Sequence, residues 1–377
     1  MKVLNNSYNE EVFDFFTADR GGRHDYVEMG DKLFIAIKKW GEGFIKEANL
    51  SPETLIPKPV HIDCINNSSI NAIAFIVRND DFIGIYEGAH HTISALFLYL
   101  LSYPGLFVGI GNIGPSDNEQ VPEFRLSRLP RSFKDFFGEN GIKRVFPKDP
   151  KRFQYALFLA NLAIQFLIRH EYAHLRHGHV DFLKEFAATP YMVENDSIPI
   201  QGLSATDRQA LEMDADSYAI VTSLTYALRC VKFREKIEPA YRGYYNTVEL
   251  ALHDLFFAAY CTFRLFSDSN DFSKLTTMTH PPAMQRLYMT VVTIDEFLRK
   301  LNETEILEKF KDILINAISY AEYVINCCTG LETDYRLYQI DEIIADPAKE
   351  HFNQIMKSWK KLRPELMKHK RCRFIAE

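Results

Sequence analysis

The stretch of the 377-residue chain that could do chemistry is the sequence HEYAH at residues 170–174. Two histidines four positions apart lie on one face of a helix, so both rings can bind a single metal ion. Glu171 is one step around that helix, within reach of a water that such an ion would activate. The spacing predicts metal-assisted hydrolysis, with His170 and His174 as ligands and Glu171 as general base. The alternative is a solvated His/Glu helix face without an ion.

A catalytic zinc site needs a third protein ligand and an open position. A metzincin would place a histidine six residues after His174, where this chain has Val180, so that subclass is excluded. The other solution is a glutamate on a separate helix, and Glu212 is the candidate. Asp216 shares its face and could accept the second ring N–H of a ligand histidine, whereas Asp214 should point elsewhere. The alternative for these three residues is an ordinary acidic helix start, favoured by the helix dipole.

With these residues the chain resembles the HtpX-like and CAAX-endopeptidase group of gluzincin metallopeptidases. The segments 70–75 and 83–88 are similar to that family's NAFA strand and the strand after it. The segment Thr279-His280-Pro281-Pro282, with Arg286, is similar to its THPPxxxR segment. All of these motifs occur in the family's order. The chain is also similar to the Lit-type phage-exclusion peptidases, which are HExxH enzymes that cut a host protein.

The resemblance implies a zincin-like gluzincin fold and a zinc ion (Zn2+) held by His170, His174 and Glu212. It implies a protein or peptide substrate, and a role for His280 near the metal, either holding the oxyanion or occluding the zinc. The alternative for His280 is a helix-entry histidine. The family's NAFA strand lies at the edge of the cleft, so strand addition by a substrate is expected here, or else a buried sheet strand. The residues of that strand are Asn71, Ala72, Ile73, Ala74 and Phe75.

Two more histidines, His177 and His179, follow the motif. His177 shares the face of His174, and either residue could be a spare ligand. Beyond the second ligand, however, the helix leaves the metal. We therefore expect both to have a solvated or capping role.

Composition narrows the class of protein. A hydrophobic fraction of 47% and a charged fraction of 25% are ordinary globular values, and a net charge of -6 gives no basic face for a nucleic acid partner. The six cysteines are scattered and form no CxxC pair, and no signal peptide is recognisable, which favours the cytoplasm. The apolar stretch 93–113 could associate with a membrane, but Pro104 and several glycines interrupt it, so a buried helix ending before Pro104 is favoured.

Local patterns predict a helix-rich α+β fold with one small sheet. Ser204 and Asp207 resemble a capping box at the start of a helix. We expect a metallopeptidase domain over residues 1–300, with a surface insertion at 114–149, and a helical C-terminal extension over 301–377. The expected strands are 60–65, 70–77 and 81–86, and the expected helices are 153–182, 206–230 and 247–266, with more from 282 onward.

The sequence thus predicts a zinc-dependent endopeptidase. Two alternatives from other classes stay open: a catalytically silent zinc-binding interaction module, and a metal-dependent hydrolase of a non-peptide amide. A membrane-bound quality-control peptidase is a third, and it depends on the stretch 93–113.

Overall fold

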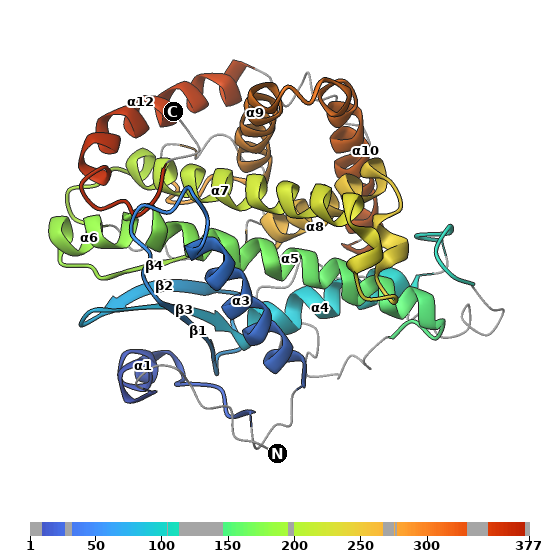
Figure 1. The fold of residues 1–377 in the computed structure, drawn as a ribbon, viewed down its shortest axis with the longest axis horizontal. Coiled ribbons are helices and arrows are strands. Elements are labelled where there is room, and N and C mark those ends of the chain that lie inside the picture. The colour runs from blue at the N-terminus through green and yellow to red at the C-terminus, as the bar shows by residue number, and fades with distance from the viewer. Residues whose placement is uncertain are drawn as a thin grey trace.

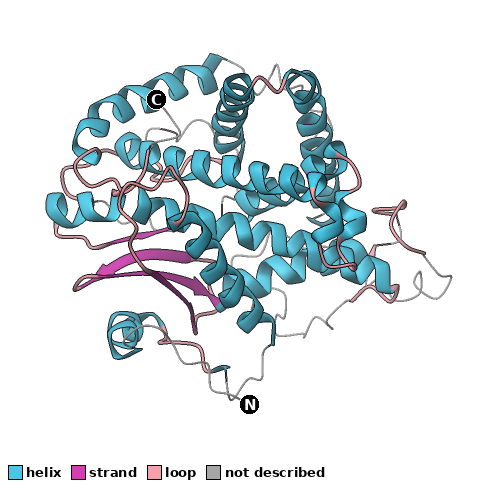
Figure 2. Ribbon diagram, viewed as in Figure 1, coloured by secondary structure: helices cyan, strands magenta, loops and turns pink. Residues whose placement is uncertain are grey.

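The computed structural model gathers long helices on one face of a small sheet (Figures 1 and 2). It confirms the predicted helix-rich α+β class. The part of the chain that the structure describes comprises residues 10–26, 32–103, 105–112, 146–194, 200–266, 275, 277–329 and 346–373. The predicted insertion at 114–149 lies outside these ranges up to residue 145.

The bounds of the longer helices follow the predicted pattern, with one exception described below. The strands are β1 (Val60–Ile65), β2 (Ala72–Val77), β3 (Asp80–Tyr86) and β4 (Tyr191–Val193). The α-helices are α1 (Glu10–Thr17), α3 (Lys32–Asn49), α4 (Glu87–Ser102), α5 (Pro150–Arg176), α6 (His179–Ala187), α7 (Ala205–Lys232), α8 (Val248–Phe266), α9 (Ala283–Leu301), α10 (Thr304–Thr329) and α12 (Asp346–Leu366).

The sheet has the order β1-β3-β2-β4, with β1 parallel to β3 and the other pairs antiparallel. Side chains alternate along β2. Ala72 and Ala74 face the main core under the helices, whereas Ile73 and Phe75 face a second, smaller cluster covered by Phe13 of α1. Because both faces are covered, β2 is apolar along nearly its whole length.

The interior position of β2 corrects one prediction. The segment 71–75 was expected either to pair with an extended substrate or to be a buried sheet strand. β2 is buried and pairs with β3 on one side and with β4 on the other, so strand addition to it is excluded. The backbone N–H of Glu194 donates to the carbonyl of Ala72 at 3.0 Å, and that of Ile76 donates to Pro190 at 2.9 Å. Both edges of β2 are therefore occupied. The strand at this end of the described sheet is β4, and its length of three residues is too short for a sequence pattern to reveal.

Helix α5 carries the HEYAH motif through the centre of the molecule (Figure 1). Its start is fixed by Asp149, whose side chain accepts hydrogen bonds from the backbone N–H groups of Lys151 and Arg152. It was predicted to run from 153 to 182, but it ends at Arg176. Gly178 then takes a left-handed conformation with φ of 80°, and α6 begins at His179.

Helix α7 lies against α5 and faces the motif. Its start is the predicted capping box: the Ser204 hydroxyl accepts from the Asp207 N–H at 3.0 Å, and the Asp207 carboxylate accepts from the Ser204 N–H at 3.1 Å. This cap fixes where the helix begins. It therefore also fixes the rotation that turns Glu212 and Asp216 toward α5.

Of the apolar stretch 93–113, residues 93–102 belong to α4 and residues 105–112 lie in the loop after it. The helix ends at Ser102, before Pro104 as predicted, and the Arg152 side chain then ties down the loop. The guanidinium donates to five backbone carbonyls at 2.7–3.1 Å, those of Leu101, Tyr103, Leu106, Phe107 and Ile110. No helix within the described ranges has the length and apolarity that crossing a membrane requires.

The C-terminal segment packs directly on the core. Helix α12 contacts α7, α9 and α6, and Trp359 on it is fully buried. After α12 the Arg371 N–H donates to the Arg176 carbonyl at 2.8 Å, and its guanidinium forms ion pairs with Asp81 and Asp181. This segment therefore closes over the end of α5.

Replacing Arg152 with methionine should lower the free energy of unfolding by at least about 3 kcal/mol, because it leaves several buried carbonyls without a donor. Denaturant unfolding of the purified variant measures this. Lys151→Met is the matched control, since Lys151 is exposed and its replacement should change stability by no more than about 0.5 kcal/mol. Equal stability of the two variants would contradict the assigned role of Arg152.

Candidate metal centre

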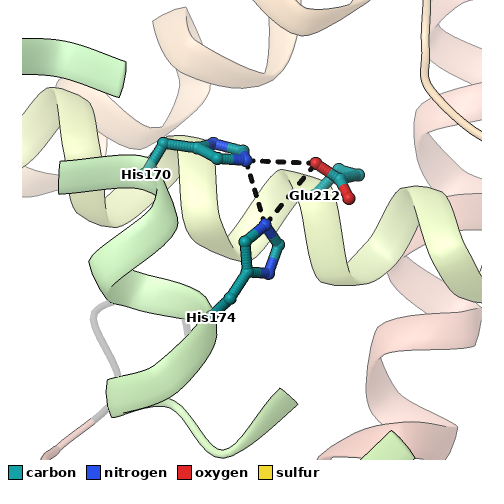
Figure 3. A group of neighbouring side chains, drawn as sticks. All are labelled: His170, His174 and Glu212. Carbon is teal, nitrogen blue, oxygen red and sulfur yellow. Dashed lines mark hydrogen bonds and ion pairs between the residues drawn. The ribbon is translucent and has the colours of Figure 1, made fainter. Parts of the chain in front are cut away.

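The ring nitrogens of the HEYAH motif converge with Glu212 of α7 (Figure 3). His170 Nε2 lies 3.0 Å from His174 Nε2, and Glu212 Oε2 lies 3.2 Å and 3.8 Å from these two atoms. In a tetrahedral site with ligands at about 2.0–2.1 Å, neighbouring ligand atoms are about 3.3–3.4 Å apart. The three atoms that the sequence singled out therefore have the separation that one shared ion requires.

The charges around these atoms also fit a cation. Four buried carboxylates, those of Glu171, Glu194, Glu212 and Asp216, lie around these atoms, and one buried guanidinium, that of Arg286, pairs with Glu194 and Asp216. Burial lowers the pKa of His170, but Glu194, Asp216 and Glu212 outweigh burial and raise it well above its usual value. Surplus buried negative charge is costly unless a cation balances it. A protonated His170 would offset one of these charges, and a bound divalent ion would offset two.

The second ring nitrogen of His170 is held by Asp216, as predicted. His170 Nδ1 donates to Asp216 Oδ1 at 2.9 Å, which leaves Nε2 to face the metal position. Arg286 of α9 holds Asp216 in turn, with Nε and Nη2 donating to its two oxygens at 2.8 Å and 2.7 Å. Arg286, which the sequence singled out as part of the THPPxxxR segment, thus orients the carboxylate that orients His170.

Glu194 is a site residue that the sequence analysis missed. It follows β4 directly, and its Oε2 lies 2.8 Å from His170 Nε2, while Arg286 Nη1 donates to its Oε1 at 2.6 Å. Burial raises the pKa of Glu194, but Arg286 and His170 together lower it to about 2, so the group is an anion. No spacing pattern connects residue 194 with the motif, because only the sheet brings the end of β4 to α5.

Glu171, the predicted general base, is fully buried, and neither carboxylate oxygen has a hydrogen-bond partner. Burial raises its pKa well above the usual value, and the negative charges of Glu194 and Glu212 raise it further. The neighbouring His170 lowers it, but by less. A positive ion close by would favour the ionised form. An unpaired carboxylate next to the metal position is what a proton acceptor for an activated water requires.

His280 lies on the other side of Glu212. Its Nε2 is 3.3 Å from Glu212 Oε1, whereas Oε2 faces the two motif histidines. Its side chain is 15% exposed, whereas the side chains of His174 and Glu212 are each 1% exposed. The structure thus brings the THPP segment to the site, as the resemblance implied, and places His280 at its more accessible side.

The predicted solvated role of His177 and His179 is wrong, whereas His177 does occupy the C-cap position of α5, where its backbone N–H donates to the carbonyl of Ala173. Both are fully buried, and both contact the Asp214 carboxylate, His177 through Nδ1 and His179 through Nε2 at 3.1 Å. Burial lowers the pKa of both rings, but Asp214 raises that of His177 to about 10, while that of His179 stays below its usual value. Asp214 does point away from the ligand atoms, as expected, but into this second cluster.

The residues described so far define a candidate hydrolytic metal centre, and a comparison with protein families bears on the class of reaction. The model of the family Peptidase U49, a family of Lit-like peptidases, matches residues 142–297, which is less than half of the chain. The matched stretch includes α5, α7 and His280, and leaves out the first three strands. The match supports a peptidase. Searches of curated proteins and of solved structures found no match.

Elemental analysis of the purified protein should find about one metal ion per chain, because His170, His174 and Glu212 supply one complete ligand set. His174→Ala and Glu212→Gln should both lose it, since each removes a ligand. His253→Gln, on α8 and outside the cluster, should keep it. A metal that persists in both ligand variants would contradict the three-ligand site.

Proposed function

We propose that this protein is a zinc-dependent endopeptidase that hydrolyses peptide bonds in a protein substrate. The observation that carries the proposal is the convergence of His170 Nε2, His174 Nε2 and Glu212 Oε2 beside the unpaired carboxylate of Glu171. Two imidazoles and one carboxylate are a typical ligand set for catalytic zinc. The Peptidase U49 match supports the reaction class, and it favours the Lit-type resemblance over the HtpX-like one.

Zinc bound by these residues would polarise the scissile carbonyl and lower the pKa of a water toward about 7. The protein's own part begins with Glu171, which accepts the proton of the attacking water and passes it to the leaving amine. His170 and His174 are held with Nε2 facing the ion. His280 Nε2 lies 3.3 Å from Glu212 Oε1 at the exposed side of the site, where it can stabilise charge on the substrate carbonyl.

The edge strand β4 offers the substrate a place to bind. Residues 190 and 194 bond inward to β2, and inward and outward groups alternate along an antiparallel strand, so the backbone groups of Tyr191 and Val193 face outward. Within the described ranges no other strand pairs with this edge. An extended peptide added there would run toward Glu194 and the metal position. The substrate role expected for 71–75 thereby moves to β4.

Glu171→Gln should keep the metal and lower kcat by at least about 100-fold, because the amide cannot accept the proton. Cleavage of unfolded protein substrates and the metal content of the same preparation measure the two effects. Glu185→Gln is the control, since Glu185 lies exposed on α6 and should leave both unchanged. A fully active Glu171→Gln enzyme would exclude this role.

The same assay tests His280. His280→Ala should retain the metal and lose activity mainly in kcat, because the missing donor acts on charge that develops during the reaction. An unchanged kcat would limit His280 to holding Glu212.

Tyr191→Pro should lower kcat/KM by about tenfold, because it removes one outward N–H that a substrate strand would use. The inward bonds of β4 remain, and proline fits an extended edge strand. Tyr191→Phe keeps the backbone donor and serves as the matched control. Metal content should not change in either variant. Equal activity of Pro and Phe variants would rule out pairing at this edge.

A further inference from the structure

A chain of buried side chains leads away from the ligand His174. Its Nδ1 lies 2.9 Å from His179 Nδ1, and His179 Nε2 lies 3.1 Å from Asp214 Oδ2. His177 Nδ1 contacts the same Asp214 oxygen. All four side chains are buried, with 1% or less of their surface exposed, so solvent water does not replace these contacts.

The direction of each hydrogen bond follows from the ligand role of His174. If Nε2 of that ring faces a metal ion, its proton must be on Nδ1. His174 Nδ1–H therefore donates to His179 Nδ1, which has to be a bare acceptor nitrogen. The proton of a neutral His179 is then on Nε2, and this N–H donates to Asp214. Every proton in the chain has one acceptor, and no two N–H groups face each other.

The same reasoning decides against a second metal ion. His177, His179 and Asp214 have ligand atoms close enough to hold one. An ion on His179 Nε2 would, however, require the proton on His179 Nδ1, where it would face the proton of His174 Nδ1 across 2.9 Å. The two ions would thus exclude each other in these tautomers. Metal at the HEYAH site leaves the second cluster to hydrogen bonds alone.

The bend after α5 makes this chain possible. In an uninterrupted helix, a residue five positions after His174 would lie about 140° around the axis and could not reach it. Gly178 turns the backbone with φ of 80°, and a Cβ there would come within 2.6–2.9 Å of His369. Glycine is therefore required at this position both for the turn and for the close approach of the C-terminal segment.

We propose that His179 and Asp214 are positioning residues that orient the metal ligand His174 through a His174–His179–Asp214 hydrogen-bond chain. The inference rests on the proposed function, because it needs a metal on His174. The two motif histidines are then supported differently: Asp216 holds His170 directly, whereas Asp214 holds His174 through an intervening imidazole. Such outer partners fix the ring orientation of a ligand and raise its basicity, and their loss typically weakens metal binding by about 10–100-fold.

A matched pair of substitutions at His179 separates this role from packing. Glutamine can accept from His174 with its oxygen and donate to Asp214 with its nitrogen, whereas leucine fills similar space and does neither. His179→Leu should weaken zinc binding by about 10–100-fold in a chelator competition, and His179→Gln should stay close to the wild type. Equal affinities for the two variants would overturn the chain. Circular dichroism of both variants verifies that they fold.

A spectroscopic measurement tests the tautomers directly. With zinc bound to the wild-type protein, nitrogen-15 NMR of labelled histidines should show His179 protonated on Nε2 and bare on Nδ1. A proton on Nδ1, or a second zinc per chain that His177→Ala removes, would overturn the proposal. Wild-type protein without any zinc would instead refute the proposed function, whereas a zinc peptidase with normal affinity in His179→Leu refutes only this chain.

Discussion

The burial of opposite charges between α5 and α7 is the constraint on which the rest of the structure depends. His170, Glu171 and His174 from one helix meet Glu212 and Asp216 from the other, all of them almost without exposed surface. Ionised groups remain in such a place only when partners or a cation compensate them. The lengths, caps and neighbours of the two helices therefore have to keep these side chains within a few ångströms of one another.

The compensation is distributed over elements that are distant in the sequence. Arg286 from α9 neutralises Asp216 and Glu194, and His280 approaches Glu212 just before the same helix. On the opposite side, Asp214 pairs with two histidines that follow α5. A metal ion would complete this arrangement from the inside, because it supplies positive charge where the described side chains leave an excess of carboxylates.

The sheet places one carboxylate of the site, that of Glu194, next to His170. β4 is short, but it pairs with β2, and Glu194 follows it directly, so the edge that we propose for an extended chain leads toward Glu194 and His170. The C-terminal segment acts at the other end of the motif. Arg371 holds the carbonyl of Arg176, and His369 packs on Gly178, which together fix the bend that returns His179 to His174. Residues expected to form an extension thus support the centre.

The sequence by itself determined the parts of the site that depend on helix periodicity. Residues four apart share a helix face whatever surrounds them, so His170 with His174 and Glu212 with Asp216 could be paired from spacing, and Ser204 with Asp207 marked the start of α7. Only the tertiary structure decided the place of Glu194, the burial of His177 and His179, and the position of β2 inside the sheet. These depend on a turn at one glycine and on contacts between distant segments, and such contacts leave no periodic signal in the chain.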